Sequence, residues 1–391
     1  MRSRFIGGIL LVVGTSIGGG MLALPLACAT AGFWPSTLLL LACWALMTLG
    51  ALYILEANLY LPRGAHMVSM AAATLGRPGL LLTWVSYLIL LYTLLCAYIS
   101  GGSDVFGALF ERMGLESAPW QRTSAFTLAF GAVVWGGIRR VDWFNRVLMF
   151  AKLGICALLI VMIAPHVDTG ALAGGSLFAG LGALMVLLTS FGFAIIVPNL
   201  RDYFEDDITA LRRVILIGSL IPLFCYLAWN TVIMGSITPN ALIPLMQSER
   251  ATSTLAALLA ARVESPLIIA AFNVFTSICM LTAFLGVSLC LFSFLGDGLR
   301  MEGRGKEGRI LFLLTFLPPL LIVLGFPGVW IHALSFAGAL CVILLLLLPA
   351  LMCLQGRRRY QSAYTVPGKS VVLWLVIVSG VGLLGFALLT L

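Results

Sequence analysis

Small and hydroxyl-bearing residues interrupt the first long apolar stretch of the chain. The interruption is Gly14-Thr15-Ser16-Ile17-Gly18-Gly19-Gly20. Because Gly costs about 1 kcal/mol relative to Ala in a helix, this stretch predicts two half-helices joined by unwound backbone. Unwound backbone at bilayer depth is tolerated where it faces protein or a water-filled cavity. Its N–H groups suit a carboxylate and its C=O groups suit a cation. The alternative is a glycine-rich contact between helices.

A second stretch repeats this plan in the later half of the chain. It is Thr189-Ser190-Phe191-Gly192-Phe193-Ala194, followed by Pro198 as the first stretch is followed by Pro25. Interrupted apolar segments at matching positions in two halves are typical of a transporter's binding site near the bilayer midplane. We therefore predict one ligand site between the two breaks, with Phe191 and Phe193 as part of its wall.

Other residues of the apolar stretches could contribute to this site. Tyr92 and Tyr98 are candidates for the ligand wall, although aromatic residues in such stretches more often pack against other helices. Three charges lie inside apolar stretches, where charges are costly and usually face the bundle interior. These are Glu56, Asp104 and Lys152.

The surroundings of these charges differ. We expect Glu56 either to contribute to coupling or to meet water or a neighbouring Arg, and Asp104 to be solvated at the outer end of its span. Lys152 lies too deep to be left without a partner, unless it snorkels to the surface. Ser277 and Thr282 supply hydroxyls that could meet it.

Several classes of protein are disfavoured. The chain contains no H-E-x-x-H, no P-loop and no Cys/His cluster, so we expect neither an enzyme nor a metal or cofactor site. Its nine Cys residues lie in apolar stretches without C-x-x-C spacing, which argues against disulfides and zinc. A channel would need repeated rings of charges or carbonyls, and the sequence gives no sign of them, so a channel is a distant alternative. Scattered basic residues also argue against nucleic-acid binding.

Composition identifies a polytopic membrane protein. Of 391 residues, 61% are hydrophobic and only 10% are charged, whereas soluble domains carry about 25% charged residues. Apolar stretches of about 20 residues predict spans, and we expect eleven in an all-α protein. Their approximate limits are 5–31, 34–60, 79–108, 121–138, 147–165, 178–200, 212–235, 265–296, 310–326, 328–354 and 370–390.

Basic residues predict the orientation of these spans. With a cytoplasmic N-terminus, only Arg112, Arg122, Arg250 and Arg262 of the 23 Lys and Arg residues lie outside. The other 19 lie inside, as the positive-inside rule requires, and the C-terminus is then outside. The longest outside connection, 236–262, includes a short predicted helix from Leu245, which would be either a lid or a passive amphipathic loop.

Counting spans predicts an inverted repeat. Residues 1–165 and 178–354 each hold five spans and each begin with an interrupted one, near 14–20 and near 189–194. Because five is odd, the second set crosses the membrane upside down relative to the first. Residues 370–390 form one additional span. The start of the chain superficially imitates a signal peptide, but its removal would delete half of this repeat.

Five segments carry a resemblance to a known family. They are Gly14 to Pro25, Ala97 to Gly101, Val141 to Arg146, Thr189 to Phe193, and Thr315 to Pro319. They resemble the bacterial hydroxy and aromatic amino acid permeases, most closely the tyrosine-specific branch. The resemblance implies a leucine-transporter-type fold and proton-driven uptake of tyrosine across the bacterial inner membrane. Tryptophan and phenylalanine remain alternative substrates, because relatives commonly carry His where this sequence has Ala194. A small hydroxy amino acid such as serine is a further alternative.

The resemblance also suggests how protons are coupled to transport. A lysine at the position of Lys152 resembles that of sodium-independent members of the wider superfamily, where the amine is thought to replace a sodium ion. Here it would hold the carbonyls near Gly14 and Thr15 to Ser277 when charged, and release them when neutral. Thr282 and Glu56 complete the candidate coupling group.

Overall fold

Helices make up the regular structure of the chain. The computed structural model describes residues 2–114, 116–136, 138–248, 250–301, 305–326, 328–360 and 364–390, and no strand occurs in these ranges. The side chains of residues 137–146, which include the Val141 to Arg146 motif, lie outside the described part. An all-helical architecture suits an apolar membrane chain, since helices satisfy their own backbone hydrogen bonds.

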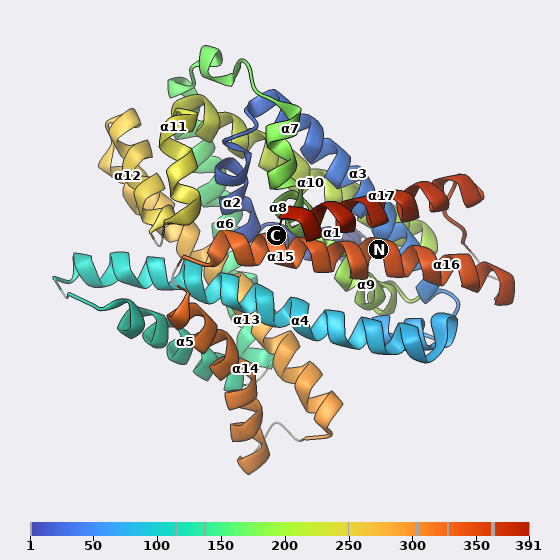
Figure 1. Cartoon of the computed structure of the whole chain (residues 1–391). Coiled ribbons are helices and arrows are strands. Elements are labelled where there is room, and N and C mark those ends of the chain that lie inside the picture. Colours follow the sequence, from blue (N-terminus) through green and yellow to red (C-terminus); the bar gives the residue numbers. More distant parts are fainter. Residues whose placement is uncertain are drawn as a thin grey trace.

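Seventeen α-helices are described in these ranges (Figure 1). In the first half they are α1 (Arg2–Ser16), α2 (Gly19–Cys28), α3 (Phe33–Asn58), α4 (Met67–Arg112), α5 (Pro119–Trp135), α6 (Ile138–Ile163), α7 (Leu177–Gly180), α8 (Leu184–Ser190) and α9 (Val197–Phe204). In the second half they are α10 (Ile208–Ser236), α11 (Pro239–Leu242), α12 (Ala251–Val263), α13 (Pro266–Leu299), α14 (Gly305–Gly325), α15 (Trp330–Cys341), α16 (Leu348–Arg359) and α17 (Lys369–Thr390).

The lengths of these helices establish a multi-pass membrane protein. Nine described helical stretches are long and apolar enough to cross a bilayer, and the bent pair of α1 and α2 makes a tenth. The fourth predicted span, 121–138, falls on α5, which has 17 residues. Our expected number of eleven therefore exceeds the number that meets the length criterion in the described residues.

Two helix breaks interrupt the bundle. The axis bends by 51° between α1 and α2, where Gly18 has the extended angles φ −151° and ψ −150°. The second break follows α8 at Phe191, which has φ −104° and ψ 30°. A 3₁₀ turn over Gly192–Ile196 then leads into α9. The breaks lie within the stretches 14–20 and 189–194, where small residues weaken the helix.

Long helices enclose the two breaks. In Figure 1, α4 crosses the molecule beside α15, and α4 also packs against α13. The first broken pair packs against α10 and α8, while α8 packs against α15. Residues Val342–Leu347 form a π-helical segment between α15 and α16, a feature often found near functional positions. The breaks are thus held at the centre of the packed bundle.

Candidate functional site

Glycines at the first break permit close packing around its N–H groups. A Cβ atom on Gly19 would lie 2.9 Å from Cε1 of Tyr98, and one on Gly20 would lie 3.0 Å from Oγ of Ser190. A Cβ atom on Gly18 would meet only Ala283, at 3.6 Å. The first amides of α2 have no partner within their helix, so this end offers hydrogen-bond donors beside an aromatic ring.

Tyr226 joins the carboxyl ends of the two broken helices. Its hydroxyl donates to the carbonyl of Ser16 at 2.6 Å and to that of Ser190 at 2.9 Å. The side chain is fully buried on α10, and its ring makes an edge contact with Phe191 at 5.2 Å between centroids. Both carbonyls lie at negative helix ends, so one hydroxyl proton is shared between two acceptors of the same polarity.

The hydroxyl groups at the breaks are bonded to backbone carbonyls. Thr15 is exposed and donates back to Leu11 and Val12 within α1, and Ser16 likewise donates to Val12. In α8, Ser190 donates to Val186, and Thr189 donates to Met185 and to Leu334 of α15. The ligand-binding capacity of the breaks therefore lies mainly in main-chain groups.

Lys152 lies buried against the first break. Its side chain is only 2% exposed, and Nζ donates to the carbonyl of Ile17 and to Oγ1 of Thr282, the latter at 3.5 Å. Among the described residues its hydrogen-bond partners include no carboxylate. The amine thus links α6 to the end of α1 and to α13, and it does not snorkel.

Of the two hydroxyls expected to meet Lys152, that of Thr282 does so and that of Ser277 does not. The Ser277 hydroxyl donates to the carbonyl of Asn273 on its own helix, and Ser277 lines a cavity of about 270 Å³ together with Asp104 and Phe126. Gly14 packs against α6, where Sδ of Met149 would lie 2.9 Å from an added Cβ, but the carbonyl that Lys152 binds is that of Ile17. Our expectation of carbonyls near Gly14 and Thr15 is corrected to Ile17, because α1 continues to Ser16 before it breaks.

The aromatic candidates separate into two groups. Tyr98, Phe191 and Phe193 are buried, and Tyr98 and Phe191 border the breaks as described above. Tyr92 instead donates its hydroxyl to the carbonyl of Leu314 in α14, at 2.7 Å. Ala194 is fully buried, whereas an added Cβ on Gly192 would meet no atom within 4 Å.

Glu56 is held in a buried ion pair away from Lys152. Its carboxylate accepts hydrogen bonds from Arg357 at 2.6 and 2.9 Å, from the Tyr60 hydroxyl at 2.8 Å and from the Val366 amide at 2.7 Å. Burial raises the pKa of Tyr60 well above its ordinary value, and the nearby carboxylate adds to the shift. Of our two expectations for Glu56, a neighbouring Arg is the one observed.

The expectation of a solvated Asp104 is wrong. Asp104 is 4% exposed, and its carboxylate accepts from the amides of Thr252 and Ser253 at 3.0 and 3.1 Å and from both of their hydroxyls. These amides lie in the first turn of α12, where helix polarity favours an anion. Asp104 therefore fastens α12 to α4, which is why it needs no water.

Tyr226 is the main feature that the sequence analysis missed. No motif surrounds it, and its role depends on the register of α10 against two distant breaks. In the described ranges, no group of three or more His, Cys, Asp or Glu side chains could hold a metal ion. The site is thus built from two broken helices, one hydroxyl, one amine and buried aromatic rings.

Known proteins resemble the chain over nearly its whole length. The sequence profile of the tryptophan/tyrosine permease family matches residues 1–387. Tyrosine-specific transport system 1 of Haemophilus influenzae is 34% identical, with 97% of this chain and 95% of that protein covered. The tryptophan-specific transport protein of the same organism is 32% identical, with 96% and 93% covered.

A solved structure shares the fold. It is a manganese transporter of Eremococcus coleocola in complex with an aromatic bis-isothiourea substituted compound. The superposition has a TM-score of 0.68 and covers 99% of this chain and 86% of that one, at 12% sequence identity. At this identity the likeness concerns the fold alone.

Proposed function

The chain belongs to the tryptophan/tyrosine permease family, and we propose that it imports an aromatic amino acid, tyrosine first, in symport with protons. The observation that carries this proposal is the family match over residues 1–387. Membership makes the chain a multi-pass permease and not an enzyme, and the names of the tyrosine- and tryptophan-specific relatives support an aromatic substrate. The preference for tyrosine, the proton and the alternating-access cycle are our proposals.

The main-chain groups of the breaks would hold the substrate's charged ends. The carboxylate would meet N–H groups near Gly18 to Gly20, and the ammonium would meet the carbonyl of Ser190, because half-helix ends carry these polarities. Tyr226 supports this assignment, since its hydroxyl donates to that same carbonyl. Substrate ammonium would then compete with the Tyr226 hydroxyl for one acceptor.

The aromatic residues beside the breaks would select the substrate's ring. Burial of an aromatic side chain stabilises binding by roughly 1.5 to 3 kcal/mol, which favours tyrosine over serine. Ala194 is buried next to Phe193 in the second break. Ala194→His should therefore change the ranking of tyrosine, tryptophan and phenylalanine as competitors. An unchanged ranking would remove Ala194 from the substrate pocket.

Lys152 would couple the proton to the conformational change. Its charged amine binds the Ile17 carbonyl more strongly than a neutral amine would, which favours the arrangement in which α1 is held to α13. Loss of the proton would weaken this contact and favour opening toward the cytoplasm. A ligand shifts a two-state equilibrium only through such a difference in contacts.

The architecture that we propose has eleven spans. Residues 1–165 and 178–354 would form a five-plus-five inverted repeat, and 370–390 an added span. The bacterial inner membrane, a cytoplasmic N-terminus and a periplasmic C-terminus complete the proposal. The placement of Lys and Arg residues supports this orientation.

The substrate proposal is tested by uptake into proteoliposomes. Radiolabelled tyrosine is offered with each of the twenty amino acids as competitor, and with unlabelled tyrosine inside to measure counterflow. We expect tyrosine to compete best, followed by tryptophan and phenylalanine, with saturable counterflow. Equal competition by serine would overturn the aromatic preference, and uptake without saturation or counterflow would indicate a channel.

A further inference from the structure

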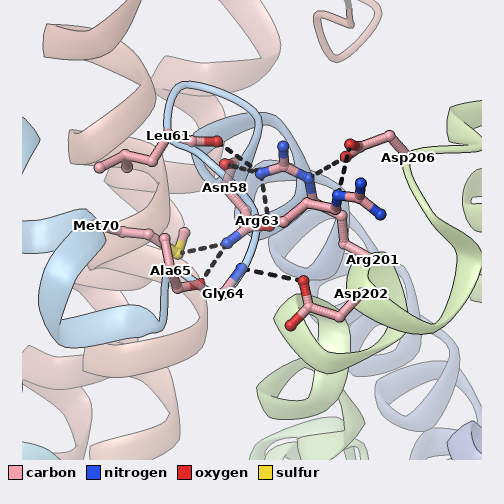
Figure 2. Close-up of polar contacts among 9 residues, drawn as sticks. All are labelled: Asn58, Leu61, Arg63, Gly64, Ala65, Met70, Arg201, Asp202 and Asp206. Carbon is pink, nitrogen blue, oxygen red and sulfur yellow. Dashed lines mark hydrogen bonds and ion pairs between the residues drawn. The ribbon is translucent and has the colours of Figure 1, made fainter.

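Arg201 is a buried charge that the proposed transport mechanism does not use. It lies on α9, the half-helix after the second break, and is only 6% exposed. Figure 2 shows its guanidinium directed at the end of α3 and at the connection 59–66 that follows. A buried guanidinium is costly unless its hydrogen bonds are met. The contacts of Arg201 offset this cost and thereby hold α9 against the end of α3.

The guanidinium of Arg201 binds acceptors at the end of α3 and in the connection after it, and also binds Asp206, which follows its own helix. Its Nη1 group donates to the carbonyl and side-chain oxygens of Asn58, the latter at 3.2 Å, and to the carbonyl of Leu61 at 2.9 Å. Its Nε group donates to Asp206 at 2.6 Å. Beside it, the Gly64 amide donates to Asp202 at 3.0 Å. We call the group of Asn58, Leu61, Gly64, Arg201, Asp202 and Asp206 the Arg201 clamp.

One side of the clamp belongs to a firmly held part of the bundle. Asn58 donates to the carbonyl of Ala65 at 2.7 Å, which closes the connection on itself. Two residues earlier in the chain, Glu56 binds Arg357 of α16 and the amide of Val366. The acceptors that Arg201 reaches are therefore tied to α16 and to the segment before α17.

The other side of the clamp belongs to the two broken helices. A Cβ atom on Gly8 of α1 would lie 2.6 Å from Cε2 of Phe204, and one on Gly7 would lie 2.7 Å from the Tyr203 hydroxyl. The rings of Tyr203 and Phe204 on α9 thus pack directly against the glycines of α1. Arg4 of α1 and Glu205, the residue after α9, add an ion pair at 3.0 Å, but both are exposed, and such pairs contribute little.

We propose that the Arg201 clamp is the cytoplasmic gate of the transport cycle. Clamped, it holds the α1–α9 unit against the α3 end and keeps the site closed on this side. When the clamp is released, α1 and α9 can move away from the end of α3. This movement opens a path from the two breaks to the cytoplasm. This inference rests on the proposed alternating access, and it makes Arg201 a positioning residue, because it acts through α9 and not on the substrate.

The gate requires arginine because of its geometry. The planar guanidinium donates to several acceptors at once, whereas a lysine ammonium is a compact point charge on a flexible stem. Arg201→Lys keeps the charge but cannot reproduce contacts with Asn58, Leu61 and Asp206 together. The matched control is Arg63→Lys, because Arg63 also faces Asp206, at 3.3 Å, but is half exposed at the rim of the clamp.

The test measures the substrate concentration that gives half-maximal transport, here called half-saturation, from each face of the membrane separately. Vesicles of both orientations are prepared, and the amino acid is whichever one the parent protein transports. A looser clamp populates the inward-open state, and apparent affinity falls with the fraction of the competent state. Arg201→Lys should therefore raise half-saturation about tenfold from the outer face and leave it unchanged or lower from the cytoplasmic face. Arg63→Lys should stay within twofold of the parent on both faces.

Two results would overturn the gate. One is an equal change on both faces for Arg201→Lys, which is expected of a merely structural residue. The other comes from the parent protein alone, so it does not depend on the variant folding. Amide hydrogen exchange of residues 59–66 should change when saturating substrate is added, and an unchanged rate contradicts a gate there. A parent that transports no aromatic amino acid refutes the proposed substrate instead.

Discussion

A single hydroxyl group connects the two helix breaks. Tyr226 donates to the last carbonyls of α1 and α8, and the carbonyl of α8, that of Ser190, is the acceptor that we propose for the substrate ammonium. This hydroxyl is one donor shared between two buried carbonyls. Unpaired buried acceptors cost about 1 to 3 kcal/mol, so this shared donor stabilises the packing of the two breaks.

Replacement of Tyr226 by Phe tests this role. Tyr226→Phe should lower the free energy of unfolding by about 1 to 3 kcal/mol, since both carbonyls lose a donor. Saturating tyrosine should restore part of the loss, because its ammonium supplies a new donor to Ser190. Thermal unfolding with and without tyrosine measures both effects.

Tyr92→Phe is the control, since Tyr92 binds Leu314 away from the breaks. The stability that this variant loses should not depend on substrate. Equal stabilisation of Tyr226→Phe and the parent protein by tyrosine would refute the competition.

The glycines of the first break differ in the space around them. Gly19→Ala would bring Cβ within 2.9 Å of Tyr98, whereas Gly18→Ala would meet only Ala283 at 3.6 Å. We expect Gly19→Ala to weaken tyrosine binding at least tenfold, because Tyr98 must move from the site. Gly18→Ala should change binding much less. Equilibrium binding of radiolabelled tyrosine to purified protein compares them, and equal affinities would show that Tyr98 does not border the ligand.

At the scale of helices, the breaks could be predicted but their partners could not. Glycine and hydroxyl residues weaken a helix locally, so residues 14–20 and 189–194 were identifiable from the sequence. Contacts between helices depend on their relative register, which local sequence does not encode. For this reason Lys152 reaches Ile17 instead of Gly14 and Thr15, and of its two expected hydroxyl partners it meets Thr282 but not Ser277.

The same limit explains the other charged residues. An intramembrane carboxylate marks either a functional group or a structural pair, and only the fold shows which partner it meets. Asp104 caps α12 and Glu56 pairs with Arg357, and both partners lie more than a hundred residues away in sequence. Tyr92 was a candidate by its position in the third apolar stretch, but the rotation of α4 directs its hydroxyl at α14.

The Glu56 pair fastens α3 to α16 and should act on stability. Removing one partner of a buried ion pair typically costs about 3 to 5 kcal/mol, so Glu56→Gln should strongly lower the thermal unfolding midpoint. The double variant Glu56→Gln/Arg357→Met should recover part of this loss, since it leaves no charge without its partner. The folded fraction of Glu56→Gln should still couple uptake to protons. Loss of coupling at unchanged stability would instead make Glu56 a proton carrier.

At the scale of the molecule, the placement of the charges along the fold fits the transport cycle that we propose. Basic residues gather in the connections that we assign to the cytoplasm, and the Arg201 clamp lies among them at the end of α3. Asp104 fastens α12 near the opposite end of α4. The two breaks and Lys152 lie between these fastenings. Such an arrangement suits a carrier whose ends open in turn, which is our central claim together with proton coupling.

The most direct test is accumulation of tyrosine driven by a pH gradient alone. Proteoliposomes are prepared without sodium, with the membrane potential clamped and the outside more acidic than the inside. We predict that the parent protein concentrates tyrosine and that Lys152→Met still exchanges tyrosine but no longer accumulates it. Accumulation by Lys152→Met with the pH dependence of the parent would show that Lys152 is not the coupling residue. Absence of gradient-driven accumulation in the parent would contradict proton symport itself.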